Sequence, residues 1–269
     1  MLSDLTFGQF YPAESFVHRL DPRVKILLLI AYVVFVFVAN SFYGLLALAV
    51  FLMLAIIFSK VPFGSMLSSI KAVLFVIIFT VILNIFFYTG ETQTVIFWII
   101  TKEALLFSAF MAIRLITLVM ASVLLTYTTT PVALTDGIES LLSPLKIIRF
   151  PVHEIALVMS IALRFIPILM NEADRIIMAQ KARGADFESG NLIKRTKAMI
   201  PVLIPLLISA FRRAEELGDA MDSRCYSAGV KRTKYKKLKL TYRDLVSTIL
   251  AVAFFGSVIF INVYGVAFL

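Results

Sequence analysis

Two short segments place a single arginine between small residues at the end of a predicted helix. The first is Ala182-Arg183-Gly184, and the second, 41 residues further along the chain, is Ser223-Arg224-Cys225. A guanidinium group carries a planar fork of hydrogen-bond donors that suits carboxylates, and small neighbours let another surface approach closely. We therefore interpret the two segments as a pair of binding tips for a partner that offers two docking positions.

Residue patterns that catalyse reactions or hold metals are missing from the sequence. Cys225 is the one cysteine, and the two histidines, His18 and His153, lie far apart, which argues against a metal or acid–base site. No phosphate-binding Gly-x-x-x-x-Gly-Lys-[Ser/Thr] loop, dinucleotide fingerprint, nucleophile elbow or His-Glu-x-x-His motif occurs. We expect no catalytic residue, metal or cofactor on this chain.

Two long helices, at residues 151–182 and about 192–221, are predicted to position the tips. Each begins apolar and ends charged. The apolar stretches, 155–170 and 198–211, are too short and too interrupted by arginine and proline to read as membrane spans. The prolines predict kinks rather than helix ends. We expect the apolar halves to lie at the membrane surface or against a membrane partner, and the charged halves to project into the cytoplasm.

The rest of the chain has the composition of an integral membrane protein. Sixty per cent of its residues are hydrophobic and 16% are charged, with a mean hydropathy of +0.94. About five spans are predicted, near residues 24–39, 45–58, 72–88, 101–127 and 245–268, while residues 93–100 suit a re-entrant or surface hairpin. The predicted fold is an all-α membrane protein with regions 1–128 (four spans), 129–243 (coupling region with two long helices) and 244–269 (last span).

The distribution of basic residues predicts the orientation. Residues 128–243 hold 19 of the 26 basic residues, whereas the proposed outer loops, 40–44 and 89–102, contain one lysine between them. The positive-inside rule then places the N-terminus in the cytoplasm and the C-terminus outside the cell membrane. The net charge of +9 includes a lysine-rich cluster at residues 231–239 beside the last span. We expect this cluster to bind anionic lipid rather than nucleic acid.

The chain resembles the transmembrane T component of energy-coupling factor (ECF) transporters, the vitamin and metal uptake systems of prokaryotes. That family carries two Ala-Arg-Gly motifs at the ends of two long cytoplasmic coupling helices. The first motif is intact at Ala182-Arg183-Gly184, and the second keeps the arginine of Ser223-Arg224-Cys225 but changes both neighbours. Residues 15–25 and 127–131 also resemble the family. Gly229 lies too far along to supply the missing helix cap, so the sequence leaves open how the second helix ends.

The resemblance implies a non-catalytic coupling subunit of an ATP-driven importer. Two cytoplasmic ABC-type ATPase subunits, which hold the ATP, would bind the tips through Ala182, Arg183, Gly184, Ser223, Arg224 and Cys225. A separate substrate-binding membrane subunit would capture a vitamin or metal micronutrient. It would dock on the apolar halves of the long helices, through Ile155, Met159, Leu163, Ile200, Leu203 and Leu207.

A stand-alone secondary transporter or membrane enzyme is the alternative. Such a protein should carry ionisable groups near the middle of the bilayer or broken helices in repeated halves. Arg114, inside the fourth predicted span, is the one such group in the sequence. We favour a structural partner for Arg114, or a position near helix ends that face the coupling region, over an ion pathway.

Overall fold

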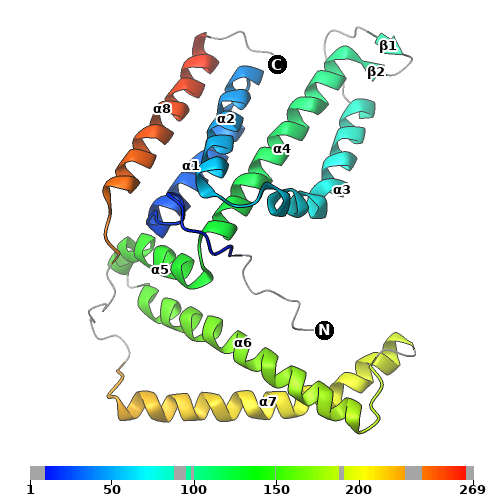
Figure 1. Cartoon of the computed structure of the whole chain (residues 1–269), viewed down its shortest axis with the longest axis vertical. Helices are drawn as coiled ribbons and strands as arrows, with labels where there is room; N and C mark the ends of the chain where they lie inside the picture. The colour runs from blue at the N-terminus through cyan, green and yellow to red at the C-terminus, as the bar shows by residue number, and fades with distance from the viewer. Residues whose placement is uncertain are drawn as a thin grey trace. The chain divides into compact units, whose positions relative to one another are not determined.

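The computed structural model describes residues 10–87, 95–97, 100–148, 150–187, 191–227 and 238–264. Helices dominate this part of the chain, which confirms the predicted all-α class (Figure 1). The elements are α1 (Pro22–Val38), α2 (Phe42–Ser59), α3 (Phe63–Phe87), β1 (Val95–Phe97), β2 (Ile100–Thr101), α4 (Lys102–Thr128), α5 (Pro131–Leu141), the 3-10 helix η1 (Ser143–Ile148), α6 (Val152–Ala182), α7 (Leu192–Ser223) and α8 (Tyr242–Tyr264).

The chain divides into two compact units. One, which we call the α6–α7 unit, contains η1, α6 and α7, and the other, the core unit, contains α1 to α5, the two strands and α8. Helix α5 lies inside the predicted region 129–243 but packs in the core unit. The division into regions 1–128, 129–243 and 244–269 stays a prediction.

Five described helices are long and apolar enough to cross a membrane: α2, α3, α4, α6 and α8. Helix α1 has 17 residues, about 26 Å at 1.5 Å per residue, so it needs its flanks to cross a hydrocarbon core of about 30 Å. Length and composition thus give α6 the same standing as four of the predicted spans. The sequence instead placed its apolar half at the membrane surface because Arg164 and Pro167 interrupt it.

Two helices begin earlier than the predicted spans. Helix α2 begins at Phe42, so flanking residues 42–44 join the predicted span 45–58, which is short by itself, and the turn after α1 is shorter than the predicted loop 40–44. Helix α3 begins at Phe63 rather than near residue 72. At this start, the carbonyl of Pro62 accepts hydrogen bonds from the amides of Ser65 and Met66. Serines and a lysine in the first turns of α3 lower its hydropathy there, and this hid the helix start.

A re-entrant or surface hairpin was expected for residues 93–100, and the two described strands there pair as a hairpin requires. The position of the hairpin relative to the membrane stays a prediction. Strands β1 and β2 pair antiparallel, with Val95 opposite Thr101 and Phe97 opposite Ile100. Thr101 then caps α4, because its hydroxyl accepts a hydrogen bond from the Ala104 amide at 3.2 Å. The predicted basic cluster at 231–239 lies, apart from residues 238 and 239, outside the described residues.

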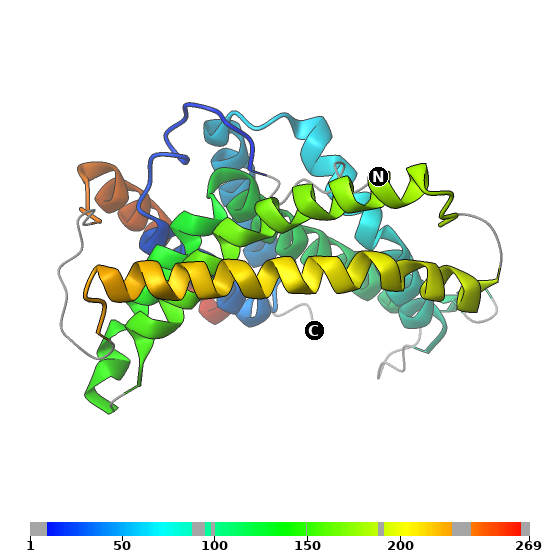
Figure 2. The same ribbon diagram turned by 90° about the horizontal axis from the view of Figure 1, so that it is seen from below.

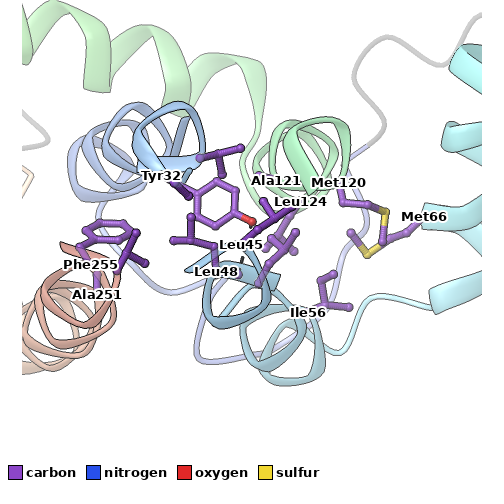
Figure 3. Close-up of a cluster of buried hydrophobic side chains, with 14 of the residues drawn as sticks. Tyr32, Leu45, Leu48, Ile56, Met66, Met120, Ala121, Leu124, Ala251 and Phe255 are labelled. Carbon is purple, nitrogen blue, oxygen red and sulfur yellow. Dashed lines mark hydrogen bonds between the residues drawn. The ribbon is translucent and has the colours of Figure 1, made fainter. Parts of the chain in front are cut away.

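An apolar cluster holds the core unit together (Figure 3). Its ring contacts join α1, α2 and α8, with Phe35 stacked on Phe255 at 4.5 Å between centroids. The Tyr32 hydroxyl donates to the Leu48 carbonyl at 3.4 Å, so this polar atom is satisfied inside the cluster. Outside the cluster, α3 exposes a Phe-rich face, including Phe75, as expected for a helix that contacts lipid.

Arg114 has the structural partner that the sequence predicted. Its Nη2 donates to the carbonyl of Ala39 at 2.6 Å, and its guanidinium lies 4.6 Å from the centre of the Phe110 ring. Asn262 of α8 donates to the neighbouring carbonyl of Val38 at 2.7 Å. The last carbonyls of a helix lack intrahelical partners, so α4 and α8 together cap the C-terminal end of α1.

Candidate functional site: two arginine tips

The two long helices occur where the sequence predicted them. Helix α6 has 31 residues and α7 has 32, which gives each about 47 Å of length. Both continue through internal prolines, Pro167 in α6 and Pro201 and Pro205 in α7. Each proline removes one backbone donor, and Figure 1 shows a bend toward the N-terminal end of α7.

Two side-chain contacts fix how α6 and α7 cross. Arg213 forms an ion pair with Glu172, with Nη2 3.3 Å from Oε2, and Gln180 donates to the carbonyl of Pro201 at 3.5 Å. Residue numbers rise along α6 while they fall along α7, so the helices run antiparallel where they touch. Figures 1 and 2 show the two C-terminal ends pointing toward opposite ends of the pair.

The first tip ends in a hydrogen-bonded glycine cap. The Gly184 amide donates to the Lys181 carbonyl and the Ala185 amide donates to the Gln180 carbonyl, both at 3.0 Å. Gly184 has φ +87°, in the left-handed region that favours glycine. These bonds define a Schellman motif, in which Arg183 is the C-cap residue just before the left-handed position.

The second tip has the same backbone although it lacks the glycine. The Cys225 amide donates to the Asp222 carbonyl at 2.8 Å, and the Tyr226 amide donates to the Met221 carbonyl at 2.9 Å. Cys225 itself takes the left-handed position, with φ +54°. The structure thus shows how the second helix ends: Cys225 takes the left-handed position in the cap of α7 that Gly184 takes in the cap of α6. A left-handed conformation costs a residue with a Cβ about 1–2 kcal/mol.

The two arginines therefore occupy equivalent backbone positions at separate places. Arg183, Arg224 and their small neighbours are all exposed. Because Gln180 contacts Pro201, the first tip lies beside that part of α7. Pro201 and Ser223 are separated by 22 residue steps, about 33 Å of helix. The pair can thus present one kind of donor group at two well-separated points.

The helix ends that carry the arginines differ in charge. The ten residues ending at Arg183 contain three basic residues and one acidic residue, a net charge of +2. The ten residues ending at Arg224 contain one basic and four acidic residues, a net charge of −3. Four acids near a helix C-terminus oppose the helix dipole. The two tips thus have the same backbone conformation but differ in the charge of the residues around them.

The predicted apolar docking residues lie on α6 and α7, and most are exposed. Ile155, Met159, Ile200, Leu203 and Leu207 are each 42–58% exposed, whereas Leu163 is partly buried. The sequence-based set missed four exposed neighbours: Val158, Ile204, Ile208 and Phe211. Val158, Ile204 and Phe211 lie three or four residues from a predicted position and Ile208 lies four residues after Ile204, so helical spacing is the signal that could have found them.

No cofactor or metal site emerges in the part of the chain that the structure describes. No group of three His, Cys, Asp or Glu side chains gathers among these residues. The chemistry available at the tips is hydrogen bonding and ion pairing by an exposed guanidinium.

Comparisons with known proteins agree with this architecture. The family described as CbiQ, cobalt transport protein, matches residues 13–235. Three relatives carry the name energy-coupling factor transporter transmembrane protein EcfT. The one from Clostridium kluyveri is 48% identical over 93% of this chain and 94% of its own length. The one from Ruminiclostridium cellulolyticum is 49% identical over 96% and 97%, and the one from Bacillus subtilis is 43% identical over 91% and 93%. The chain belongs to this family, as a multi-pass transmembrane component of the energy-coupling factor type.

Proposed function

We propose that the chain is the coupling subunit that links two cytoplasmic ABC-type ATPases to a separate substrate-binding membrane subunit. One observation carries the proposal: two helices end in the same backbone cap with an exposed arginine at the same position. A matched pair of tips about 33 Å apart along α7 suits a partner with two docking grooves. ATP would bind and be hydrolysed on the partners, and this chain would be non-catalytic.

The exposed apolar residues of α6 and α7 are the proposed docking positions for the substrate-binding subunit, and they lie at separate places along the antiparallel pair, because Pro201 contacts Gln180 near the C-terminal end of α6. Ile200, Leu203 and Leu207 form a stripe on α7, and Ile155 and Met159 add apolar surface on α6. A large exposed apolar patch usually marks an interface. Because the helices cross and contact each other, a change in the spacing of the tips would move this surface. The partner would carry the vitamin or metal ion.

The proposed orientation places the N-terminus and both tips in the cytoplasm and the C-terminus outside, in the cell membrane. The positive-inside rule supports it. The tips must also be cytoplasmic if they bind ATPases there.

Two observations weigh against a stand-alone transporter or membrane enzyme. Arg114, the candidate for an ion pathway, is engaged as a cap of α1. A cavity among α1, α2, α4 and α8 is lined mostly by apolar side chains, and the charged one among them, Lys25, donates to three acceptors of its own chain. A site that selects a polar substrate needs polar groups available to it.

The test replaces the two tip arginines by alanine, singly and together. Losing one partner of a desolvated charge pair typically costs about 2–5 kcal/mol, at least roughly 30-fold in affinity. The second contact is effectively intramolecular. Each single change should therefore reduce co-purification with the ATPases in part, and the double change should abolish assembly and ATP-driven uptake of labelled vitamins or divalent metal ions. Lysine should rescue poorly because it lacks the planar fork.

Matched controls are available on the same helices. Arg175 and Arg212 are exposed arginines on α6 and α7 away from the caps, and their alanine variants should assemble normally. A double Arg183→Ala, Arg224→Ala variant that assembles and transports at the wild-type rate would contradict the proposal. So would saturable vitamin or metal binding by this chain alone.

A further inference from the structure

Residues 15–25, which resemble the family but take no part in the tips, include the N-terminal end of α1. This end of α1 contacts the end of α4, through which the chain leaves the core unit, and the start of α8, where it returns. The chain leaves through the end of α4 and α5 toward α6, and it returns at residues 238–241 to begin α8. Figure 1 shows the start of α1, the end of α4 and the start of α8 at the same end of the core unit. All the contacts described next lie within the core unit.

Lys25 binds the end of α4, through which the chain leaves the core unit toward α5 and α6. Its ammonium donates to the Thr128 carbonyl at 2.8 Å, to the Thr129 hydroxyl at 3.1 Å and to the His18 carbonyl at 3.2 Å. These three bonds use all the donors of an ammonium group, and Lys25 is only 6% exposed. The Thr128 carbonyl is one of the last in α4, where helices lack internal donors and favour a cation.

Helix α5, the next element of the outgoing chain, packs against the same end of α1. A Cβ placed on Gly137 would lie 3.1 Å from Pro22 Cβ and 3.1 Å from Ile26 Cδ1. These distances are tighter than most contacts of real Cβ atoms, so glycine lets α5 approach α1 this closely without displacing its neighbours. The outgoing chain is therefore held at two successive points by residues 22–26.

Asp244 joins the start of α8, where the chain returns to the core unit, to the start of α1. Its two carboxylate oxygens accept hydrogen bonds from the Asp21 amide and from the Thr241 amide, each at 2.7 Å. Arg23 donates to the carbonyl of Leu238 at 3.4 Å. Asp21 in turn caps α1, because its side chain accepts from the Arg23 amide at 2.9 Å. One helix end thus holds both the start of α8 and the segment that precedes it.

The charges of this cluster balance, so its members depend on one another. Asp21 and Asp244 are 7% and 3% exposed, and they are offset by Lys25 and Arg23. Buried charges are tolerated when they are paired and hydrogen-bonded, and removing one partner leaves another charge uncompensated. Apolar packing could fasten helices equally well for stability alone. What a directed polar cluster adds is a fixed geometry at the end of α4 and at the start of α8, the described parts of the core unit that lead out to α6 and back into the core unit.

We propose that Asp21, Lys25 and Asp244 form a junction that transmits movement of the α6–α7 unit into the core unit. The inference rests on the proposed coupling function. Two described segments of the core unit, residues 128–137 on the way to α6 and residues 238–244 at the start of α8, are bonded to the N-terminal end of α1. The other end of α1 is held by Arg114 of α4 and Asn262 of α8. Displacing either segment therefore displaces α1 and the helices bonded to it.

Hydrogen exchange in the assembled complex, with and without ATP, tests the junction without requiring the transported substrate. In the wild-type complex, ATP should change amide exchange both in α6–α7 and in core-unit segments 15–30 and 238–250. In Asp244→Asn and Lys25→Gln complexes, the ATP-dependent change should persist in α6–α7 and fall at least fivefold in the core unit. ATP hydrolysis should stay within about threefold of wild type.

Two further variants keep the test decisive. Thr129→Val removes one acceptor of Lys25 with little change of shape, so it should reduce the core-unit response in part even if the charge variants fold poorly. Arg19→Gln removes a basic residue of the same segment whose partner, Glu14, is exposed, and it should leave the response intact.

A core-unit response to ATP that survives at wild-type size in Asp244→Asn and Thr129→Val would overturn the junction. Exchange that rises in the core unit equally with and without ATP, while the ATP-dependent difference persists, would also overturn it, because that pattern marks a purely structural role. Failure of the proposed function looks different: the wild-type chain would not assemble with ATPases, or its tips would not respond to ATP.

Discussion

Cys225 occupies a backbone position that the first tip assigns to glycine. Its φ of +54° is costly for a side chain with a Cβ, and the cap bonds from Cys225 and Tyr226 keep it there. The thiol is exposed, so burial of the side chain does not offset that cost. The geometry of the second arginine thus depends on a locally strained residue.

Substituting Cys225 by glycine should stabilise this helix end by about 1 kcal/mol, because glycine adopts the left-handed conformation without the steric cost. Valine should destabilise it, since a β-branched residue disfavours positive φ most strongly. Amide exchange at Tyr226, whose N–H closes the cap, measures the effect. Faster exchange at Tyr226 in Cys225→Gly than in wild type would contradict the assignment of strain.

Arg114 should matter for stability rather than for an ion pathway. Arg114→Met leaves the Ala39 carbonyl without its donor, and an unsatisfied buried group costs about 1–3 kcal/mol. We expect a lower melting temperature in detergent, with assembly retained by the folded fraction. Lys102→Met, an exposed change at the start of the same helix, should have little effect. Unchanged stability with lost transport would favour the ion-pathway alternative.

At the scale of the elements, the hydropathy and charge patterns predicted where the helices lie in the sequence but not how they pack against each other. The two long helices were predicted at 151–182 and 192–221 and occur at Val152–Ala182 and Leu192–Ser223. The change from apolar to charged residues along each helix, together with the interpretation of the internal prolines as kinks rather than helix ends, made this prediction possible. The crossing of α6 and α7 could not be predicted, because Glu172–Arg213 and Gln180–Pro201 join residues far apart in sequence. Many other pairings would fit the same pattern.

The tips show the same limit at finer resolution. The arginines and their small neighbours were evident from residue types alone. Yet Ser223-Arg224-Cys225 gave no sign that a cysteine would take a left-handed conformation, because residue propensities place glycine there. The polar junction around Lys25 was also missed. Its partners at residues 128–129 and 244 come from distant segments, and isolated charges near predicted spans were used only to assign orientation.

The contact between α5 and α1 makes a prediction in which packing opposes helix propensity. Alanine is favoured over glycine inside a helix by about 1 kcal/mol, so Gly137→Ala would stabilise an isolated α5. In the core unit the new Cβ would lie 3.3 Å from the backbone carbon of Pro22, which cannot rotate away. We therefore expect net destabilisation, measured as a lower melting temperature.

Gly256 of α8 is the matched control, because nothing lies within 4 Å of the Cβ that alanine would add there. Gly256→Ala should be neutral or stabilising. If Gly137→Ala proved as stable as Gly256→Ala, the close packing of α5 on α1 would be refuted.

At the scale of the whole molecule, the proposed function requires both tips to face ATPases in the cytoplasm. Apolar helices establish a multi-pass membrane protein, but helix length does not distinguish the two sides of the bilayer. The positive-inside rule predicts the side from the basic residues, 19 of 26 of which lie between residues 128 and 243. The lone cysteine of the chain lies at the second tip, so the native sequence carries its own reporter of orientation.

In intact cells, Cys225 should not react with a membrane-impermeant maleimide, whereas in inside-out vesicles it should react readily, because the thiol is exposed. For the opposite side, Asn40→Cys in a Cys225→Gly background places an exposed thiol in the turn between α1 and α2, and it should react in intact cells. Cys225→Gly alone serves as the unlabelled control. Labelling of Cys225 from outside, with Asn40→Cys protected, would reverse the orientation. Both arginines would then lie on the side of the membrane without ATP, where they could not couple its hydrolysis to uptake.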